Sequence, residues 1–190
     1  MNLTTRQKEI TGAALRLIAE RGIQNLTIRN LAKSIGVTEA AIYRHFPGKS
    51  EIIRALIMRF EKMIQWHEGL RGWAAIRMYA MNRIDLILKN PSLAHVFFSE
   101  EIFQDDEESR KLLQDTMNKH KQALEKRFQE AMADGQLRQD VAIDNLPCII
   151  YGSVRLLIKH WGLSGYAFDL KQRCQQLLDT LEQILQPPQA

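Results

Sequence analysis

The first part of the chain has apolar residues at the spacing of an amphipathic helix. The residues that share this i, i+3, i+4, i+7, i+8 spacing are Ile10, Ala13, Ala14, Leu17 and Ile18. The spacing places one apolar stripe on a helix over about residues 5–21, since 3.6 residues complete each turn. Gly22 follows at the position where a helix-terminating glycine is expected.

Two short helical segments come next, and each begins after a threonine that can cap its N-terminus. Thr27 stands before residues 28–35, and Thr38 stands before residues 39–46, where Pro47 ends the helical pattern. Two such helices joined by a tight glycine-containing turn are typical of a helix-turn-helix. Because helices this short are marginal alone, flanking helices must hold them, and the outer face of the second is left free to contact another molecule.

Helical periodicity continues to the end of the chain. A long helix begins at about residue 50, and five more are predicted over about residues 73–89, 92–102, 105–133, 143–161 and 168–185. The sequence therefore predicts an all-α fold of about nine helices. Its expected domains are a three-helix helix-turn-helix head over residues 1–49 and a helical bundle over residues 50–190, linked by the helix from residue 50.

Composition narrows the class of protein. Apolar residues make up 45% of the chain and charged residues 25%, as in ordinary globular proteins. The longest apolar stretch, residues 146–158, is interrupted by Arg155 and is too short to span a bilayer. The N-terminus lacks the apolar core of a signal peptide. Two cysteines are too few for the disulfide bonds that stabilise small secreted domains. We expect a soluble protein of the reducing cytoplasm, with no membrane partner.

Charge is concentrated at the N-terminal end. Residues 1–62 contain 11 Lys and Arg against 5 Asp and Glu, a net charge of +6. The remaining residues contain 15 against 17, a net charge of −2, which leaves +4 for the whole chain. A basic segment on a near-neutral body predicts a polyanionic partner for that segment. The alternative is a solvated surface with uneven charge.

Motifs for catalysis or metal binding are not found in the sequence. The five histidines are far apart, and no His-x-x-x-His pair, Cys-x-x-Cys pair or glycine-rich phosphate loop occurs. Residues 162–165 (GLSG) are one residue short of a nucleophile elbow. The acidic run at residues 105–108 complements the dipole at a helix start better than it resembles a calcium loop. We therefore expect no enzyme, no metal and no cofactor.

One pattern at fixed spacing is specific enough to indicate a family. It consists of residues 26–32 (LTIRNLA), 36–46 (GVTEAAIYRHF) and 49–51 (KSE). Over residues 10–52 the chain resembles the DNA-binding head of the TetR family of bacterial transcriptional regulators. It departs from the family at Ala40, where glycine is frequent, and at Gly48, where serine or asparagine is frequent. Neither departure removes a DNA-contacting side chain.

The second short helix is narrow enough for its N-terminal residues to reach base edges in a major groove. The residues that lead it are Thr38, Glu39, Ala40 and Ala41. Glu39 could accept from a cytosine amino group, and the alanines allow close approach or contact with a thymine methyl. The resemblance implies phosphate contacts for Thr27, Arg29, Tyr43, His45 and Lys49. For Tyr43 the alternative is a half-buried aromatic residue of the head's own core.

The helix over residues 143–161 is apolar almost all round, so it must be covered on two sides. One side can be its own domain and the other a second subunit, in a four-helix interface that the resemblance also implies. The residues expected at this dimer interface are Ile150, Ser153, Leu157, Leu178, Leu181 and Leu185. The alternative is a larger monomeric core.

The resemblance also implies an effector pocket in the helical body. The candidate lining residues are Trp66, Phe97, Phe98, Met117, His120 and Leu124, with His120 as a lone polar group on an apolar stripe. Such a lining suggests an apolar or aromatic ligand and, without Arg or Lys, disfavours a sugar phosphate. Plain core residues are the alternative for each position.

These observations predict a nucleoid-associated, cytoplasmic repressor that binds a palindromic operator as a homodimer and is released by a small, largely apolar effector. The alternative is a constitutive DNA-binding protein without effector, which acts through protein partners in chromosome or division control. An enzyme with a small helical head is a third reading, which the missing motifs disfavour.

Overall fold

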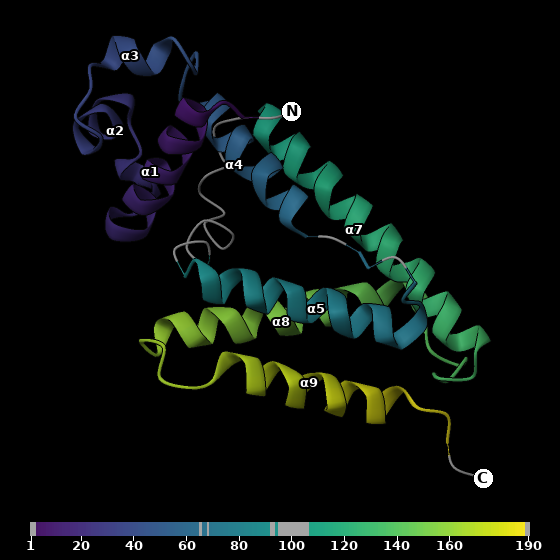
Figure 1. Ribbon diagram of the computed structural model, residues 1–190. Helices are drawn as coiled ribbons and strands as arrows, with labels where there is room; N and C mark the ends of the chain where they lie inside the picture. Colours follow the sequence, from purple (N-terminus) through teal and green to yellow (C-terminus); the bar gives the residue numbers. More distant parts are fainter. Residues whose placement is uncertain (1–2, 65, 68, 92–93, 95–106, 189–190) are drawn as a thin grey trace. The chain divides into compact units, whose positions relative to one another are not determined.

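The computed structural model describes residues 3–64, 66–67, 69–91, 94 and 107–188 (Figure 1). In these ranges the chain forms eight α-helices and two short 3₁₀ turns, with no strand. The all-α fold expected from the sequence is confirmed. The helix expected over residues 92–102 lies outside the described residues.

The chain divides into two compact units. The head unit comprises residues 1–63 and 90–115, and the body unit comprises residues 64–89 and 116–190. The expected boundary at residue 49 differs from this division because α4 (Lys49–Met63) packs against α1 (Thr5–Arg21). The first residues of α7 (Glu107–Ala133) belong to the head unit and the others to the body unit.

Side-chain caps start the helices of the head unit. Thr4 begins α1 with a capping box: its hydroxyl accepts from the Gln7 amide at 3.2 Å, and its own amide donates to the Gln7 side chain. Thr27 and Thr38 cap α2 (Ile28–Ser34) and α3 (Glu39–Tyr43), as the sequence predicts. Gly22 ends α1 with a φ of 78°, a conformation that favours glycine. A 3₁₀ turn over Ile23–Asn25 leads to α2.

The second short helix is shorter than expected, because α3 ends at Tyr43 instead of continuing to residue 46. The His45 amide donates to the Ile42 carbonyl at 2.9 Å, which is a tighter i to i−3 bond. Pro47 disfavours helical backbone at Phe46, whose ring is buried in the head core. The Phe46 amide also donates to the Ile42 carbonyl, at 3.0 Å, so a mixed turn follows α3 and ends before the proline.

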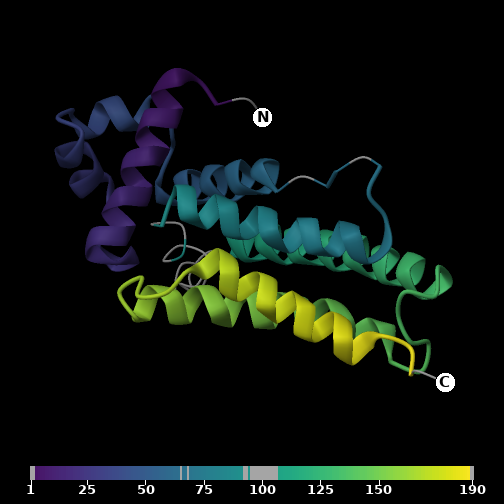
Figure 2. The same cartoon turned by 60° about the horizontal axis from the view of Figure 1, so that its bottom comes forward.

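The body unit contains α5 (Gly72–Lys89), most of α7, α8 (Leu146–Leu163) and α9 (Leu170–Leu185). In Figures 1 and 2, α5, α8 and α9 lie side by side, and contacts between all three pairs agree. A 3₁₀ turn over Ile143–Asn145 precedes α8, so this helix begins three residues later than expected. Pro147 fits its first turn, where no backbone donor is needed.

Side chains from the C-terminal end of α7 and the following turn cap the N-terminus of α5. The Gly72 amide donates to the Glu130 carboxylate at 3.1 Å, and the Trp73 amide donates to the Gln136 side chain at 3.0 Å. Arg127 also donates to Glu130, at 2.8 Å. Backbone donors that a helix start leaves without partners are thus satisfied.

Glu130→Gln is expected to lower the free energy of unfolding by about 1 kcal/mol at pH 7, because it removes a charge-assisted hydrogen bond. The hydrogen bond from Arg127 holds the pKa of Glu130 below its usual value, and the Gly72 amide adds to this effect. A carboxyl of lowered pKa stabilises the fold above its unfolded pKa, and this contribution is lost as the pH falls through its folded pKa. Urea unfolding at pH 7 and near pH 3 measures the difference.

The matched control is Glu125→Gln, which breaks only the i, i+4 pair of Glu125 with Lys121 at 3.4 Å. Its expected effect is about 0.5 kcal/mol or less. An equal loss of stability for Glu130→Gln at both pH values would contradict the cap, because the charged form would then contribute nothing.

Candidate nucleic-acid interface and effector site

The residues expected to contact DNA lie on the outer side of the helix-turn-helix. Seven of them are exposed: Thr27, Arg29, Thr38, Glu39, Ala40, Tyr43 and Lys49. Ala41 and His45 are half-buried. The Tyr43 ring is 51% exposed, which disfavours the alternative of a core aromatic. The set is thus available to a partner along α2, α3 and the start of α4.

The inner side of α3 packs against the head core, which leaves the side with the expected DNA-contacting residues exposed. Ile42 is fully buried and Phe46 nearly so, which holds the inner side of α3 and its last turn against the head core. The Gln7 side chain from α1 donates to the His45 carbonyl at 3.2 Å and ties down the end of this segment. Because Ile42 faces inward, the small side chain of Ala40 is left at the surface, where a base edge could approach closely.

The polar groups of this face are suited to phosphate oxygens. The Thr27 and Thr38 hydroxyls each accept a capping hydrogen bond, so each keeps its own hydrogen to donate. Within the described ranges, Arg29 and Lys49 have no acidic partner, whereas Arg6 is paired with Glu9. Unneutralised cations beside free hydroxyl donors are what phosphate contacts require.

A polar cluster lies inside the body unit, between α5 and α8. The Tyr79 hydroxyl donates to the Tyr151 hydroxyl at 2.8 Å, and Arg83 donates to both oxygens at 2.8 and 2.9 Å. Tyr79 is only 1% exposed, and burial raises the pKa of its hydroxyl. The Tyr79 hydroxyl therefore keeps its hydrogen at physiological pH and donates it to Tyr151.

One tyrosine hydroxyl hydrogen of this cluster has no acceptor within it. Each tyrosine has one hydroxyl hydrogen, and the bond between Tyr79 and Tyr151 uses only one of the two. Arg83 can only donate, so it takes up neither hydrogen. Whichever tyrosine donates to the other, one hydroxyl hydrogen has no acceptor in the described part of the chain. The cluster thus contains one hydrogen-bond donor without an acceptor among the described residues.

Aromatic rings surround the tyrosine pair. Trp66 stacks on Tyr79 with a centroid distance of 4.5 Å and an interplanar angle of 12°. The ring of His120, which is buried, lies 5.6 Å from Tyr79 and 6.4 Å from Tyr151. The Arg127 guanidinium lies 5.7 Å from the Trp66 ring centre, within the range of a cation–π contact.

The structure brings together only part of the expected effector pocket. Trp66 and His120 meet at the tyrosine pair, while Leu124 is fully buried and Met117 is 48% exposed. Phe97 and Phe98 lie outside the described residues. Beside His120 lie two tyrosine hydroxyls and the Arg83 guanidinium that binds them, so His120 is not the one polar side chain at this position. The lining of an effector pocket stays a prediction.

The sequence pattern did not identify Tyr79, Arg83 and Tyr151 as candidate site residues. Tyr79 and Arg83 lie four residues apart on one helix face, and Tyr151 is a polar-tipped residue in a strongly apolar helix. Both signals are present in the sequence, but their meeting depends on the packing of α5 against α8.

The residues expected at a dimer interface divide between two faces. Ile150, Leu178 and Leu185 are buried in the subunit's own core, so they offer no surface to a partner. Ser153, Leu157 and Leu181 are half-buried. The large apolar side chains that α8 and α9 leave exposed are instead Ile149, Leu156, Leu163 and Ile184. Since α8 is apolar almost all round, periodicity could not separate its inner face from its outer face.

In the described ranges, no group of three or more His, Cys, Asp or Glu side chains could hold a metal ion. None of the described helices is long and apolar enough to cross a membrane.

Comparison with known proteins matches both units. Residues 10–56 match the model of bacterial regulatory proteins of the tetR family. Residues 70–187, more than half of the chain, match the C-terminal region of MAATS-type transcriptional repressors.

Individual relatives and a solved structure agree with these matches. The chain is 30% identical to the nucleoid occlusion factor SlmA of Marinobacter nauticus over 145 residues, 71% of this chain and 70% of that protein. It is 23% identical over 195 residues to the "Probable acrEF/envCD operon repressor" of Escherichia coli K12, over 97% of this chain and 88% of that protein. The structure of FadR from Bacillus subtilis in complex with stearoyl-CoA has the same fold, with a TM-score of 0.73 at 22% identity, covering 94% of this chain and 97% of that one. The chain therefore belongs to the TetR family of bacterial regulators, and it is a DNA-binding transcriptional regulator rather than an enzyme.

Proposed function

We propose that this protein is a dimeric repressor of the cytoplasm and nucleoid that binds a palindromic operator and is released by a small, largely apolar effector with one polar acceptor group. The observation that carries the proposal is the pairing of two features in one chain. An exposed helix-turn-helix face has free cations and hydroxyls, and a buried tyrosine pair has an unused hydrogen-bond donor.

The effector class follows from the lining of the candidate site. Stacked aromatic rings favour an apolar body, and the unused hydroxyl hydrogen favours an oxygen acceptor such as a carbonyl or carboxylate. The stearoyl-CoA of the Bacillus subtilis FadR structure combines a long apolar chain with a thioester carbonyl. We therefore propose fatty acids and acyl thioesters as the first compounds to test.

Chain connectivity provides a route from the effector to DNA. Trp66, which stacks on Tyr79, follows the last residue of α4 by three positions, and α4 belongs to the head unit. A ligand that displaces Trp66 would move α4 and change the separation of the two recognition helices of a dimer. A coupling of about 1–3 kcal/mol would lower operator affinity about 5- to 150-fold.

Selection of bound sequences from random DNA tests whether the protein binds specific sites and determines the operator sequence. We expect two half-sites related by two-fold symmetry, with centres about 34–36 Å or a multiple of that apart. Selected sites without any two-fold relation would contradict dimeric binding. A thermal-shift screen with fatty acids and acyl thioesters follows, and each compound that binds is tested for release of the selected operator. Binding without release would contradict effector control.

Lys49→Ala is expected to weaken binding to all DNA sequences and to lower the salt slope of the binding constant by about one phosphate contact. Tyr43→Phe is expected to weaken binding with little change of slope, since it removes a neutral donor. Titrations of the selected operator and of an unrelated duplex at several salt concentrations measure both. Glu39→Gln is the matched control, because a base contact would change which sequences are preferred. An unchanged slope for Lys49→Ala would remove this residue from the phosphate contacts.

A second candidate function is constitutive DNA binding with action through a protein partner. It is favoured by the 30% identity to a nucleoid occlusion factor. The two functions differ in one measurement: operator affinity that no tested ligand changes, together with capture of a partner by the DNA-bound protein, would favour the second.

A further inference from the structure

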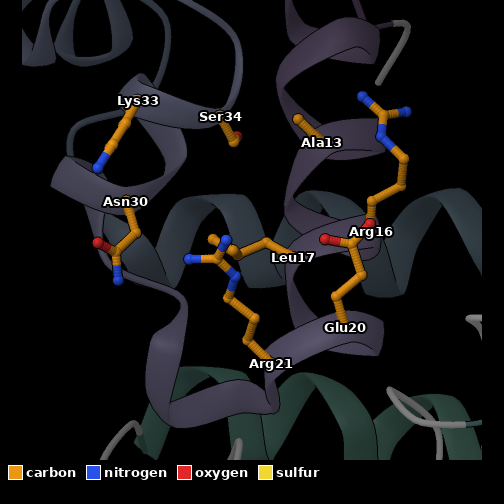
Figure 3. A pocket seen from close by; sticks show the side chains of 8 residues that line it. All are labelled: Ala13, Arg16, Leu17, Glu20, Arg21, Asn30, Lys33 and Ser34. Carbon is orange, nitrogen blue, oxygen red and sulfur yellow. The ribbon is translucent and has the colours of Figure 1, made fainter.

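The head unit has a hollow of about 330 Å³ between α1 and α2 (Figure 3). Its floor contains Ala13 and Leu17, which are buried in the head core. Polar side chains line the rest: Arg16, Glu20, Arg21, Asn30, Lys33 and Ser34. None of these eight residues belongs to the set that the family resemblance assigns to DNA. The proposed DNA face therefore leaves this hollow without a role.

Among the described residues, the positive charge of the hollow is only partly compensated. Arg16 and Arg21 come from α1 and Lys33 from α2, and none of the three has an acidic partner in the described part of the molecule. Glu20 is the one acidic side chain among the eight, which leaves a net charge of +2. In Figure 3 the Arg21 guanidinium lies between the two helices, on the side of Asn30. Elsewhere in the head unit Arg6 and Arg54 are paired with glutamates.

We propose that this hollow binds an acidic peptide segment of a partner protein, with an apolar side chain on the floor and carboxylates at the arginines. Guanidinium groups bind carboxylates through paired hydrogen bonds. A volume of about 330 Å³ is at the lower end of the range for ligand sites and suits a few side chains.

A peptide fits these features better than DNA does. The phosphate backbone offers no apolar group for Ala13 and Leu17, and a duplex cannot enter a hollow of this size. The assigned DNA residues lie at the start of α2, on α3 and at the start of α4. The hollow uses the second half of α1 and later residues of α2. Lys33 lies one helical turn from Arg29, so a DNA contact is the outcome that the experiment must distinguish.

The experiment measures binding of a fluorescent peptide to the full-length protein saturated with its selected operator. The probe has glutamates and aspartates on both sides of a central leucine, and the control peptide has glutamine and asparagine in their place. Because bound DNA covers the cations of the DNA face, binding that persists comes from elsewhere. Arg16→Gln/Lys33→Gln is expected to weaken binding about tenfold or more, and Glu20→Gln is expected to strengthen it. All three side chains are exposed, so these variants keep the core intact.

Arg6→Gln/Lys8→Gln is the matched control, since it removes the same charge from the other end of α1 and is expected to leave peptide affinity unchanged. Several results would overturn the proposal. These are absence of binding, equal loss in the control variant, and displacement of the peptide by operator. A fall in operator affinity and salt slope for Arg16→Gln/Lys33→Gln would assign the hollow to DNA instead.

Discussion

Leu156→Glu is expected to convert the proposed dimer into folded monomers and to lower operator affinity about a hundredfold or more. Leu156 is 67% exposed on α8, and Ile149, Ser153 and Leu163 share its face at helical spacing. Ile184 on α9 is 61% exposed. An exposed apolar face of this extent is typical of an interface, and an unpaired charge buried there would cost about 3–5 kcal/mol.

Sedimentation equilibrium measures the dimer, and circular dichroism verifies that the variant stays folded. Met117→Glu is the matched control, since it places the same charge at a half-exposed apolar position on α7. Ile150→Glu separates interface from core: Ile150 is 2% exposed in the single subunit, so this change should unfold the body unit. A folded dimer of Leu156→Glu with normal operator affinity would place the interface on another surface.

Tyr151→Phe is expected to lower effector affinity about ten- to a hundredfold while operator affinity without effector stays unchanged. The substitution removes the hydroxyl through which Tyr151 binds Tyr79 and Arg83. With Tyr79 as the donor in this pair, the hydrogen left for the ligand is that of the Tyr151 hydroxyl. The substitution removes this hydrogen, and the donor that remains lies on a different oxygen, that of Tyr79. A hydrogen bond to a charged group contributes about 1.5–3 kcal/mol, which matches this range. Calorimetric titration with the fatty acid or thioester found in the screen measures the change.

Tyr166→Phe is the matched control, because it removes a tyrosine hydroxyl from a residue that is 48% exposed in the loop before α9. Thermal unfolding without ligand shows whether loss of the Tyr79–Tyr151 bond destabilises the body unit. Effector affinity that is unchanged in Tyr151→Phe, in a folded protein, would place the effector away from the tyrosine pair.

Local pattern and tertiary packing decided different features of the head unit. The caps at Thr27 and Thr38 and the end of α1 at Gly22 depend on nearest neighbours, so they could be predicted from the sequence. The end of α3 at Tyr43, three residues before the expected end, could not be predicted from the local pattern. The exposure of the predicted DNA face follows from the burial of Ile42 on its opposite side.

In the body unit, the hydrophobic periodicity predicted the helices but not which of their faces are buried. The sequence by itself determined that it is helical, that α8 is apolar almost all round, and which family the helix-turn-helix motif resembles. Only the tertiary structure decided that Ile150 faces the core while Leu156 faces outward, since both satisfy the same periodicity. It also decided that Tyr151, from a helix 72 residues further along the chain, meets Tyr79 and Arg83. Helix formation depends on neighbours within one turn, whereas the choice of buried face and the meeting of distant side chains depend on how the helices pack.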